Sequence, residues 1–410
     1  MQVRKIDTVI VGAGQAGLSI SRLLKEQNRD HIILEKNSQI AESWRNRWDS
    51  FTLVTPNWQL KLPGYAYQGE NPDGFLPRDE VVRYLEGYAE SFNPPIRFET
   101  PVTAVEKNGT KPGGLVYTVD DTYEAEHVVV AAGTFQRPNF PECSSKVPEE
   151  ITQLHSSEYR NPDMLPDGNV LVVGSGQSGS QIAQELHESG RKVYLATSKV
   201  GRLPRRYRGE DGMWWAVKLG MTERTVDQLD SPEERFAPNP KISGKNGGTD
   251  INLHQFARDG VTLLGRVQDI RDRKAILVSD LHDNLAFADT MASEFYKGVD
   301  KYVEKTGLSV PEESVEELRD GYEQEQLSEL HLDDHDIRTV LWATGFRWDY
   351  SWIQPLVLDQ FGYPKQERGV SEYPGLYFLG IHWMHSLKSG LFLGVGEDAA
   401  YVAEHIDGRS

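Results

Sequence analysis

The sequence carries one glycine spacing twice, and this repeat limits the fold more than any other feature. The first copy reads Gly12-x-Gly14-x-x-Gly17, and the second copy, 162 residues later, has glycines at positions 174, 176 and 179. Each copy lies between an apolar run typical of a buried strand and a stretch with helical spacing of apolar residues. Strand, G-x-G-x-x-G turn and helix together form the dinucleotide-binding fingerprint. We therefore predict an α/β protein with two Rossmann-like dinucleotide-binding domains.

The first copy has the features expected of an FAD site. Gly12 permits the tight turn, Gly14 lets the backbone approach the pyrophosphate, and Gly17 lets the helix pack close to the strand. The helix N-terminus offers free N–H groups and a positive dipole end to phosphate. Glu35 ends the next strand, 23 residues beyond Gly12, where its carboxylate can accept hydrogen bonds from ribose hydroxyls.

The second copy lacks that acid. Position 23 beyond Gly174 is Thr197, followed by Ser198, Lys199 and an arginine-rich run. Without a carboxylate a ribose 2′-phosphate is not repelled, and hydroxyl, ammonium and guanidinium groups can bind it. We predict that this unit prefers NADP(H) to NAD(H), with these candidate ligands: Gly174, Gly176, Gln177, Ser178, Gly179, Thr197, Ser198, Lys199, Arg202, Arg205 and Arg206. The alternative for the arginines is a solvated surface patch.

Two apolar runs that end in Ala-x-Gly flank the second unit, at residues 127–133 and 337–345. Such strand-to-turn segments suit crossings between an FAD domain and an inserted nicotinamide domain, although each also fits an ordinary core strand. The predicted order is an FAD-binding domain at 1–160, an NADP-binding domain at 161–336, and the rest of the FAD-binding domain at 337–410.

A third strand ending in glycine is predicted at 375–380, and a helix is predicted to begin near Gly394. His382 and His385 lie between them and are candidates for contact with a flavin, whose reduced ring is anionic. The alternative is that both are ordinary loop histidines with satisfied hydrogen bonds.

Composition excludes several classes of protein. The chain has 410 residues, a formal net charge of −18 and one cysteine, Cys143. One cysteine cannot form an internal disulfide, a CxxC redox pair or a thiolate metal cluster, so dithiol reductases and zinc modules are excluded and no metal site is expected. The acidic balance disfavours nucleic acid and anionic membranes as partners. We expect a cytoplasmic protein with a small-molecule substrate, and homo-oligomerisation is left open.

The acidity is concentrated in one segment, residues 281–336, which has 16 acidic and 4 basic residues. Within 283–305, apolar residues recur at intervals of four and three, which predicts an amphipathic helix. The run from Glu312 to Asp336 reads as loop and solvated helix. This acidic segment is either an excursion of the NADP-binding domain, or a lid over the substrate entrance or a partner surface.

Several motifs beyond the glycines match one family. They are Glu42-Ser-Trp-Arg, Trp48-Asp-Ser-Phe-Thr-Leu, Leu62-Pro, Pro204-Arg-Arg-Tyr-Arg-Gly, Asn252-Leu-His-Gln-Phe-Ala-Arg, Ala343-Thr-Gly-Phe and Lys388-Ser-Gly-Leu. Together with both fingerprints, they make the chain resemble class B flavoprotein monooxygenases over nearly its whole length, and most closely the CzcO-like group.

The chain departs from the family pattern in three places. The linker signature is matched in its second half by His155 and Tyr159, but Glu149 and Ile151 replace its Phe and Gly. Arg160 stands where the ketone-oxidising members have proline, which weakens a Baeyer–Villiger activity. The asparagine that the family places before a proline is displaced, because Asn57 follows Pro56.

The resemblance implies that NADPH passes hydride to FAD, and that the reduced flavin forms a C4a-(hydro)peroxide with O2 and delivers one oxygen atom to a small organic substrate. NADPH oxidase or flavin reductase activity releasing H2O2, and a non-catalytic nucleotide sensor, are the alternatives. Candidate catalytic residues are His155, Tyr159, His382, His385 and Asn57. Candidate FAD residues are Gly12, Gly14, Gln15, Ala16, Gly17, Glu35, Lys36, Trp44, Arg45, Val102, Ala132, Gly133, Gly345, Gly380, Ser389, Gly390 and Leu391.

Overall fold

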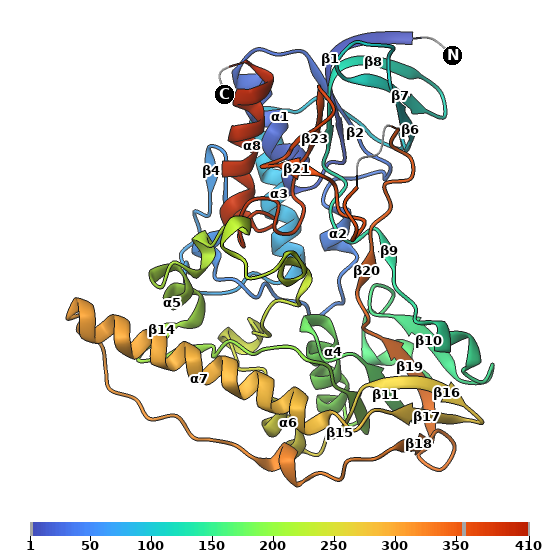
Figure 1. Cartoon of the computed structure of the whole chain (residues 1–410), viewed down its shortest axis with the longest axis vertical. Helices are drawn as coiled ribbons and strands as arrows, with labels where there is room; N and C mark the ends of the chain where they lie inside the picture. Colours follow the sequence, from blue (N-terminus) through green and yellow to red (C-terminus); the bar gives the residue numbers. More distant parts are fainter. Residues whose placement is uncertain (1–2, 355–357, 409–410) are drawn as a thin grey trace.

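Two β-sheets divide the chain into two bodies, which are stacked one above the other in Figure 1. The computed structural model describes residues 3–354 and 358–408. The upper body contains the nine-stranded sheet and both ends of the described chain, and the lower body contains the five-stranded sheet. This arrangement confirms the predicted α/β class with two dinucleotide-binding domains.

The upper sheet is built around β1 (Val3–Val11), whose apolar half is buried. β8 (Thr122–Val130) and β2 (His31–Leu34) pair with β1 in parallel on its two sides. The other strands of this sheet are β5 (Ile96–Arg97), β6 (Val102–Glu106), β7 (Gly114–Thr118), β21 (Gln366–Glu367), β22 (Val370–Ser371) and β23 (Leu376–Phe378). Its helices are α1 (Gln15–Glu26), α2 (Glu42–Arg45), α3 (Arg78–Phe92) and α8 (Phe392–Ile406).

The lower sheet is parallel throughout. Its strands β11 (Asn169–Val173) and β12 (Val193–Ala196) are almost continuously apolar, as expected for strands covered on both faces. The strand order of this sheet is β10 (Thr152–His155), β19 (Ile337–Trp342), β11, β12 and β15 (Thr262–Leu264). The main helices of this body are α4 (Gln177–Glu188), α5 (Gly212–Lys218), α6 (Leu253–Asp259) and α7 (Leu281–Thr306).

Small antiparallel pairings complete the fold. They involve β3 (Lys61–Leu62) with β4 (Tyr65–Ala66), β13 (Arg206–Tyr207) with β14 (Glu210–Asp211), and β17 (Lys274–Leu277) with both β16 (Val267–Arg271) and β18 (Glu329–His331).

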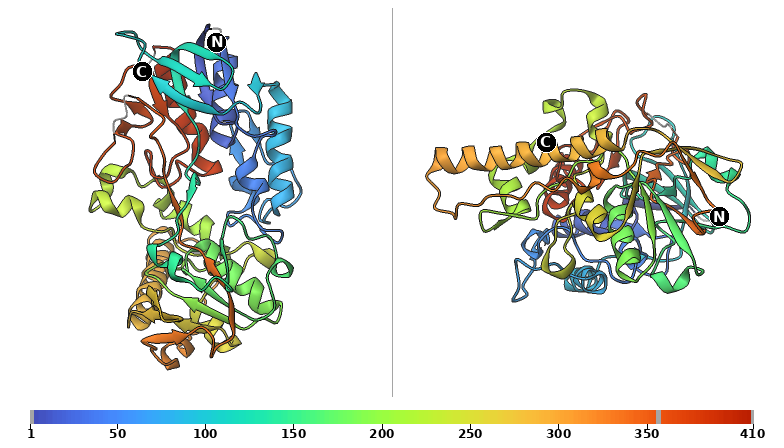
Figure 2. Two further views of the ribbon diagram at one scale, coloured as in Figure 1. Left: turned by 90° about the vertical axis from the view of Figure 1, so that its right-hand side faces the viewer. Right: turned by 90° about the horizontal axis from the view of Figure 1, so that it is seen from below.

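The chain passes between the two bodies twice, and the two crossings lie side by side. β9 (Arg137–Pro138) leads down from β8, and β20 (Phe346–Arg347) leads back from β19. They pair antiparallel, with Phe346 opposite Pro138 (Figure 2). The lower body is therefore inserted into the upper one, as the sequence predicts.

The pairing of two strands bears on the edges of the inserted domain. β10 and β19 pair with each other in the lower sheet, although both lie on the FAD side of the predicted edges at 160 and 337. β10 contains His155 of the linker signature, so this strand of the lower sheet ends before the predicted edge at 160. We propose that the insertion extends from the end of β9 to the start of β20.

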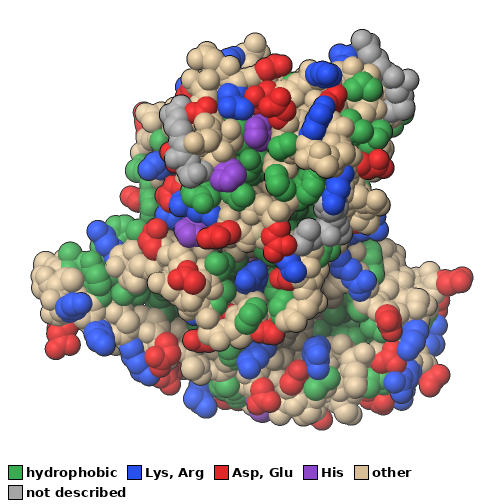
Figure 3. Space-filling view, turned by 45° about the horizontal axis from the view of Figure 1, so that its top comes forward, with side chains coloured by type: hydrophobic (Ala, Val, Ile, Leu, Met, Phe, Trp, Pro, Cys, Tyr) green, Lys and Arg blue, Asp and Glu red, His purple; other side chains and the backbone are tan. Residues whose placement is uncertain are grey.

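The acidic segment contains the predicted helix, α7, but little of the second one. The buried face of α7 includes Leu285, Ala288, Ala292, Phe295 and Val299, in agreement with the predicted apolar stripe. Residues 307–319 follow as an irregular strand-like connection, and β18 then pairs with β17. On the face drawn in Figure 3, basic side chains lie between acidic ones over both bodies, so the net charge does not produce one acidic field there.

In the part of the chain that the structure describes, every helix is too short or too polar to cross a bilayer.

Candidate active site: two nucleotide loops and the joint between them

The first glycine loop is packed so closely that two of its three glycines leave no room for a side chain. A Cβ on Gly12, which has φ +106°, would lie 2.7 Å from the carbonyl oxygen of Ala131, and a Cβ on Gly17 would lie 1.9 Å from that of Gly12. A Cβ on Gly14 would meet nothing within 4 Å. The outer glycines are therefore required by packing, and the middle glycine borders open space where a ligand can approach the backbone.

The second loop repeats this geometry. Gly174 has φ +104°, and its Cβ would lie 2.5 Å from the carbonyl oxygen of Ala343, while a Cβ on Gly179 would lie 1.8 Å from that of Gly174. Gly176, like Gly14, has nothing within 4 Å of the Cβ position. Ala131 directly follows β8 and Ala343 directly follows β19, the strands that lead to the two crossings. Each crossing segment therefore also packs against one of the glycine loops.

Glu35 is fixed beside the first loop. One carboxylate oxygen accepts a hydrogen bond from the backbone N–H of Ala13 at 2.7 Å, and the other accepts from the N–H of Asn37 at 2.9 Å. Glu35 is 7% exposed, so the carboxylate has a defined orientation at the end of β2. Its use for ribose hydroxyls remains a prediction.

A glutamine follows the middle glycine in each loop and ties the loop to a distant segment. Gln15 donates to the carbonyl oxygen of Gly390 at 2.8 Å and accepts from the indole N–H of Trp44 at 3.1 Å. Gln177 exchanges two hydrogen bonds with the backbone of Ile242. Their amides hold neighbouring segments in place, and the predicted contact of Gln15 and Gln177 with cofactors stays a prediction.

Ser198 and Lys199 line a surface pocket of about 720 Å³ after β12. The far wall comes from α7, where the ring of Phe287 lies 5.0 Å from the Lys199 ammonium. The lining of the pocket contains two cations, Lys199 and Arg266, and two acids, Asp280 and Asp283, and Asp280 pairs with Arg266 at 3.8 Å. Lys199 and the Ser198 hydroxyl are therefore the groups of this pocket that could bind a phosphorylated ribose.

Two predicted phosphate ligands are directed elsewhere. The Thr197 hydroxyl is buried and donates to the carbonyl oxygen of Leu264 at 2.7 Å. Arg205 is 2% exposed, pairs with Asp211 and donates to the carbonyl oxygen of Val54 at 2.8 Å. We correct these two assignments, because both polar groups are already paired inside the protein.

The two remaining arginines differ in exposure. Arg202 is half-buried and lies 3.4 Å from Asp289 of α7. Arg206 is exposed and donates to the carbonyl oxygen of Gly247 at 2.8 Å. Both stay as candidates for the second nucleotide site.

His155 is a structural residue of the joint. Its Nε2 donates to the carbonyl oxygen of Gly345 at 2.9 Å, so its Nδ1 accepts from the Ser157 hydroxyl at 2.8 Å. Burial lowers the pKa of His155, which favours this neutral form. Tyr159, also fully buried, donates to Glu185 of α4 at 2.8 Å. Both side chains connect the crossing segment to the lower body, and neither has a proton directed at open space.

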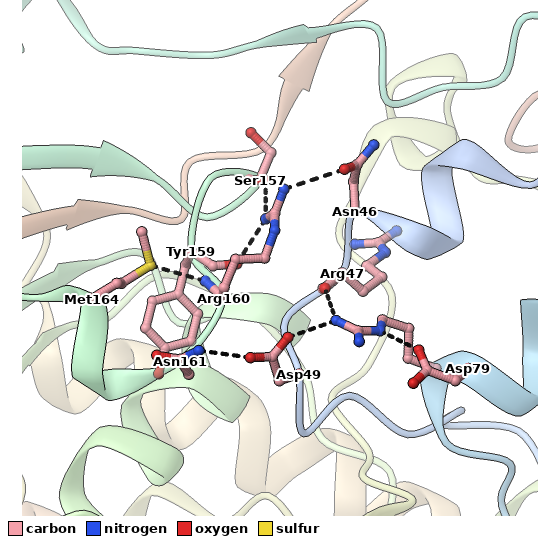
Figure 4. Close-up of polar contacts among 10 residues, drawn as sticks. Asn46, Arg47, Asp49, Asp79, Ser157, Tyr159, Arg160, Asn161 and Met164 are labelled. Atoms are coloured by element: carbon pink, nitrogen blue, oxygen red, sulfur yellow. Dashed lines mark hydrogen bonds and ion pairs between the residues drawn. The ribbon is translucent and has the colours of Figure 1, made fainter. Parts of the chain in front are cut away.

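The segment after Tyr159 contacts the loop after α2, as Figure 4 shows. The backbone N–H of Asp49 donates to the carbonyl oxygen of Arg160 at 2.8 Å, and the Asn161 amide donates to the Asp49 carboxylate at 2.6 Å. Arg160 also donates to the Asn46 side chain at 3.3 Å. Arg160 therefore helps to hold the crossing segment against the upper body. The family signature, which has proline at this position, did not indicate this role.

Asn57 is not placed for catalysis. Its amide donates to the carbonyl oxygen of Asn71 at 2.9 Å, and its side-chain oxygen accepts from the N–H of Leu76 at 2.8 Å. With 2% exposure, this side chain holds the 71–76 loop and cannot touch a substrate without releasing it.

The loop before α8 is ordered by Ser389. Its fully buried hydroxyl oxygen accepts hydrogen bonds from the backbone N–H groups of His385 and Ser386, both at 3.0 Å. These bonds order the loop, and a contact of Ser389 with a cofactor stays a prediction. Lys388 in the same loop bonds Glu397 of α8 and Glu223 of the lower body, a contact between the bodies that the sequence did not signal.

Most of the remaining predicted cofactor residues lie where a strand ends or a helix begins. Those after strands are Ala132 and Gly133 (β8), Gly345 (β19), Gly380 (β23) and the exposed Lys36 (β2), and those at helix starts are Ala16 (α1), Ser178 (α4), Gly390 and Leu391 (α8). Val102 begins β6, and Arg45 of α2 pairs with Glu86.

His382 gives a testable pH dependence. Burial lowers its pKa to about 4, whereas a histidine in an unfolded chain titrates near 6.5. Between these values the unfolded state binds a proton that the folded state does not, so stability should fall as the pH drops from about 6.5 to about 4. We expect His382→Gln to make this fall shallower in thermal unfolding, relative to His187→Gln on α4. Equal slopes for the two variants would contradict the assignment.

Comparison with known proteins gives a consistent result. A family described as "Pyridine nucleotide-disulphide oxidoreductase" matches residues 9–208. The chain is 35% identical over 404 residues to an uncharacterized CzcO-like oxidoreductase of Geobacillus kaustophilus, covering 98% of each chain. It is 31% identical to the rice indole-3-pyruvate monooxygenase YUCCA4 over 244 residues, 54% of each chain. A flavin-containing monooxygenase structure from Stenotrophomonas maltophilia has the same fold, with a TM-score of 0.67, 19% identity and 99% coverage of both chains.

Proposed function

Because this chain belongs to the CzcO-like oxidoreductases, we propose that it is an FAD- and NADPH-dependent monooxygenase that inserts one oxygen atom of O2 into a small organic substrate. The observation that carries the proposal is the pair of equivalent glycine loops. Each has an open middle glycine at a helix N-terminus, one beside the carboxylate of Glu35 and the other beside the pocket of Ser198 and Lys199. One chain with both loops can bind a flavin and its reductant together.

The residues fit these two cofactors. The first loop and Glu35 would hold the pyrophosphate and ribose of FAD, and the N-terminus of α8 would lie at its ring system. The second loop would hold the pyrophosphate of NADPH, with Lys199 at its 2′-phosphate. FAD supplies the hydride and oxygen chemistry when bound, so the protein needs no acid–base triad of its own.

The side chains of the joint then have positioning roles. Trp44 stacks on Phe392, the first residue of α8, at a ring distance of 5.4 Å, and its indole also holds Gln15. These contacts connect the FAD loop to the α8 N-terminus.

The proposal is tested on the purified holoenzyme by stopped-flow spectroscopy. We expect an oxygenated flavin spectrum that persists when reduced enzyme meets O2 in the presence of NADP+, and NADPH oxidation that accelerates with substrate. Rapid substrate-free NADPH oxidation with one H2O2 per NADPH would identify an oxidase instead. A colourless protein without turnover would identify a nucleotide sensor. Dithiol chemistry is excluded, because Cys143 is the only cysteine.

Lys199 is expected to determine coenzyme preference. An exposed ammonium at the 2′-phosphate favours NADPH over NADH, and each charge-assisted contact contributes about tenfold in affinity. Lys199→Ala should raise the KM for NADPH by about tenfold and leave the KM for NADH almost unchanged. Steady-state kinetics with both coenzymes measures this ratio, with Lys192→Ala as the surface control. A wild-type preference for NADH would contradict the assignment.

A further inference from the structure

Arg47, two residues after α2, is half-buried, and its guanidinium has no acidic partner among the residues that the structure describes. Its Nε is inaccessible and has no hydrogen-bond partner, and within the described residues its two terminal nitrogens make no hydrogen bond or ion pair either. In Figure 4 the neighbours Asn46 and Asp49 are bonded to other residues, while the Arg47 guanidinium has no dashed line to it. By contrast, Arg45 pairs with Glu86, and Arg205 pairs with Asp211.

Three aromatic rings surround this cation. The Arg47 guanidinium carbon lies 4.5 Å from the ring centre of Phe135, 5.7 Å from that of Phe51 and 6.0 Å from that of Trp44. Phe51 and Trp44 belong to the upper body, and Phe135 lies in the first crossing. Cation–π attraction offsets only part of the cost of removing a guanidinium from water.

The apolar surface continues from this cation toward the joint. Phe135 is 52% exposed and packs edge-to-face against Phe346 of the second crossing, with ring centres 5.1 Å apart. A ligand whose anion bonds Arg47 would therefore meet an exposed aromatic face beside it. Burial without a neighbouring acid lowers the pKa of Arg47 to about 10, so the group is still charged at neutral pH.

We propose that Arg47 binds the anionic group of the substrate, and that the substrates are organic acids with a carboxylate or sulfonate on an apolar body. This inference rests on the proposed function, since it names the substrate class of the same site. The position agrees with it, because Trp44, three residues earlier, contacts both Gln15 of the FAD loop and Phe392 of α8. A planar guanidinium suits two-point recognition of a carboxylate or sulfonate.

A cofactor phosphate is the competing anion. The two nucleotide loops have helix N-termini for their pyrophosphates, and Lys199 lies in the pocket beside the second loop. Arg47 instead lies beside three aromatic rings, which favour a ligand with apolar surface around its charge.

The experiment measures equilibrium binding to the oxidised holoenzyme, so it needs no turnover. Phenylacetate and octanoate are titrated against their neutral amides, with tryptophan fluorescence and the flavin spectrum as readouts. The wild type, Arg47→Met, Arg47→Lys and the exposed-surface control Arg83→Met are compared, and the Kd values for FAD and NADPH are measured for each.

We expect the wild type and Arg83→Met to bind at least one acid about tenfold or more tightly than its amide. Arg47→Met should lose this preference, Arg47→Lys should keep part of it, and FAD and NADPH affinities should change less than about threefold. Equal binding of acids and amides by the wild type, or an acid preference that persists in Arg47→Met, would overturn the inference. So would a tenfold loss of FAD or NADPH affinity with the acid preference intact. The proposed function is tested separately by the stopped-flow experiment above: acid binding through Arg47 without a persistent oxygenated flavin would uphold the anion site and count against the monooxygenase.

Discussion

Gly176→Ala is expected to remove most NADPH binding while the protein stays folded and keeps its FAD. The backbone at Gly176 (φ −69°) suits alanine, and its Cβ would have no protein atom within 4 Å. The added methyl group would instead occupy the space that a pyrophosphate needs. We expect NADPH to bind at least about tenfold more weakly, with unfolding free energy changed by less than about 0.5 kcal/mol.

Gly179→Ala, in the same motif, should by contrast destabilise the folded protein. Its Cβ would lie 1.8 Å from the backbone oxygen of Gly174, and backbone cannot move aside as a flexible side chain can. Separation of α4 from β11 should lower the unfolding free energy by about 3 kcal/mol or more. Urea unfolding and NADPH titration of both variants test the contrast. Destabilisation of Gly176→Ala, or NADPH binding by it at the wild-type Kd, would show that the middle glycine does not border the nucleotide.

Arg205→Met should be among the most destabilising single substitutions in this chain. The Arg205 guanidinium pairs with Asp211, donates to Val54 and Ser243 carbonyl oxygens and lies 4.7 Å from the ring centre of Phe75. Val54 and Phe75 belong to the upper body, so this one side chain joins the two bodies. Methionine would leave the Asp211 carboxylate buried without its partner, at a cost of about 3–5 kcal/mol.

The neighbouring residue gives the control. Arg206 is exposed, so Arg206→Met should change the unfolding free energy by less than about 0.5 kcal/mol. Adding Asp211→Asn to Arg205→Met should restore part of the lost stability, since the unpaired charge is then removed. If Arg205→Met unfolds like the wild type but loses NADPH affinity, then Arg205 is a phosphate ligand after all.

The parts of the fold that the sequence predicts are those dictated by backbone sterics. Gly12, Gly17, Gly174 and Gly179 are needed because a Cβ at each would overlap a carbonyl oxygen, and that requirement is local enough to read from spacing. The apolar stripe of α7 is readable for the same reason, because helix geometry alone places Leu285 and Val299 on one face.

The incorrect assignments depended on partners distant in the chain. Counting 23 residues from Gly174 reaches Thr197, but only the position of β15 shows that its hydroxyl bonds Leu264. Arg205 lies in a run of exposed-looking charges, and its burial follows from Val54 and Phe75, about 130–150 residues earlier. The sequence did not point to Arg47, because whether an arginine has an acidic partner depends on residues that are distant in the chain.

The pairing of the two crossings also bears on the origin of this chain and on how its domains can be re-engineered. Because β9 and β20 are hydrogen-bonded neighbours, the lower body begins and ends at adjacent points of the upper one. Insertion of one domain into another is tolerated when the two ends of the inserted domain lie close together. Replacing residues 139–345 with a short turn would convert β9 and β20 into a hairpin. An exchange of the lower body between relatives would therefore need one backbone junction, together with matched contacts such as those of Arg205 and Lys388 between the bodies.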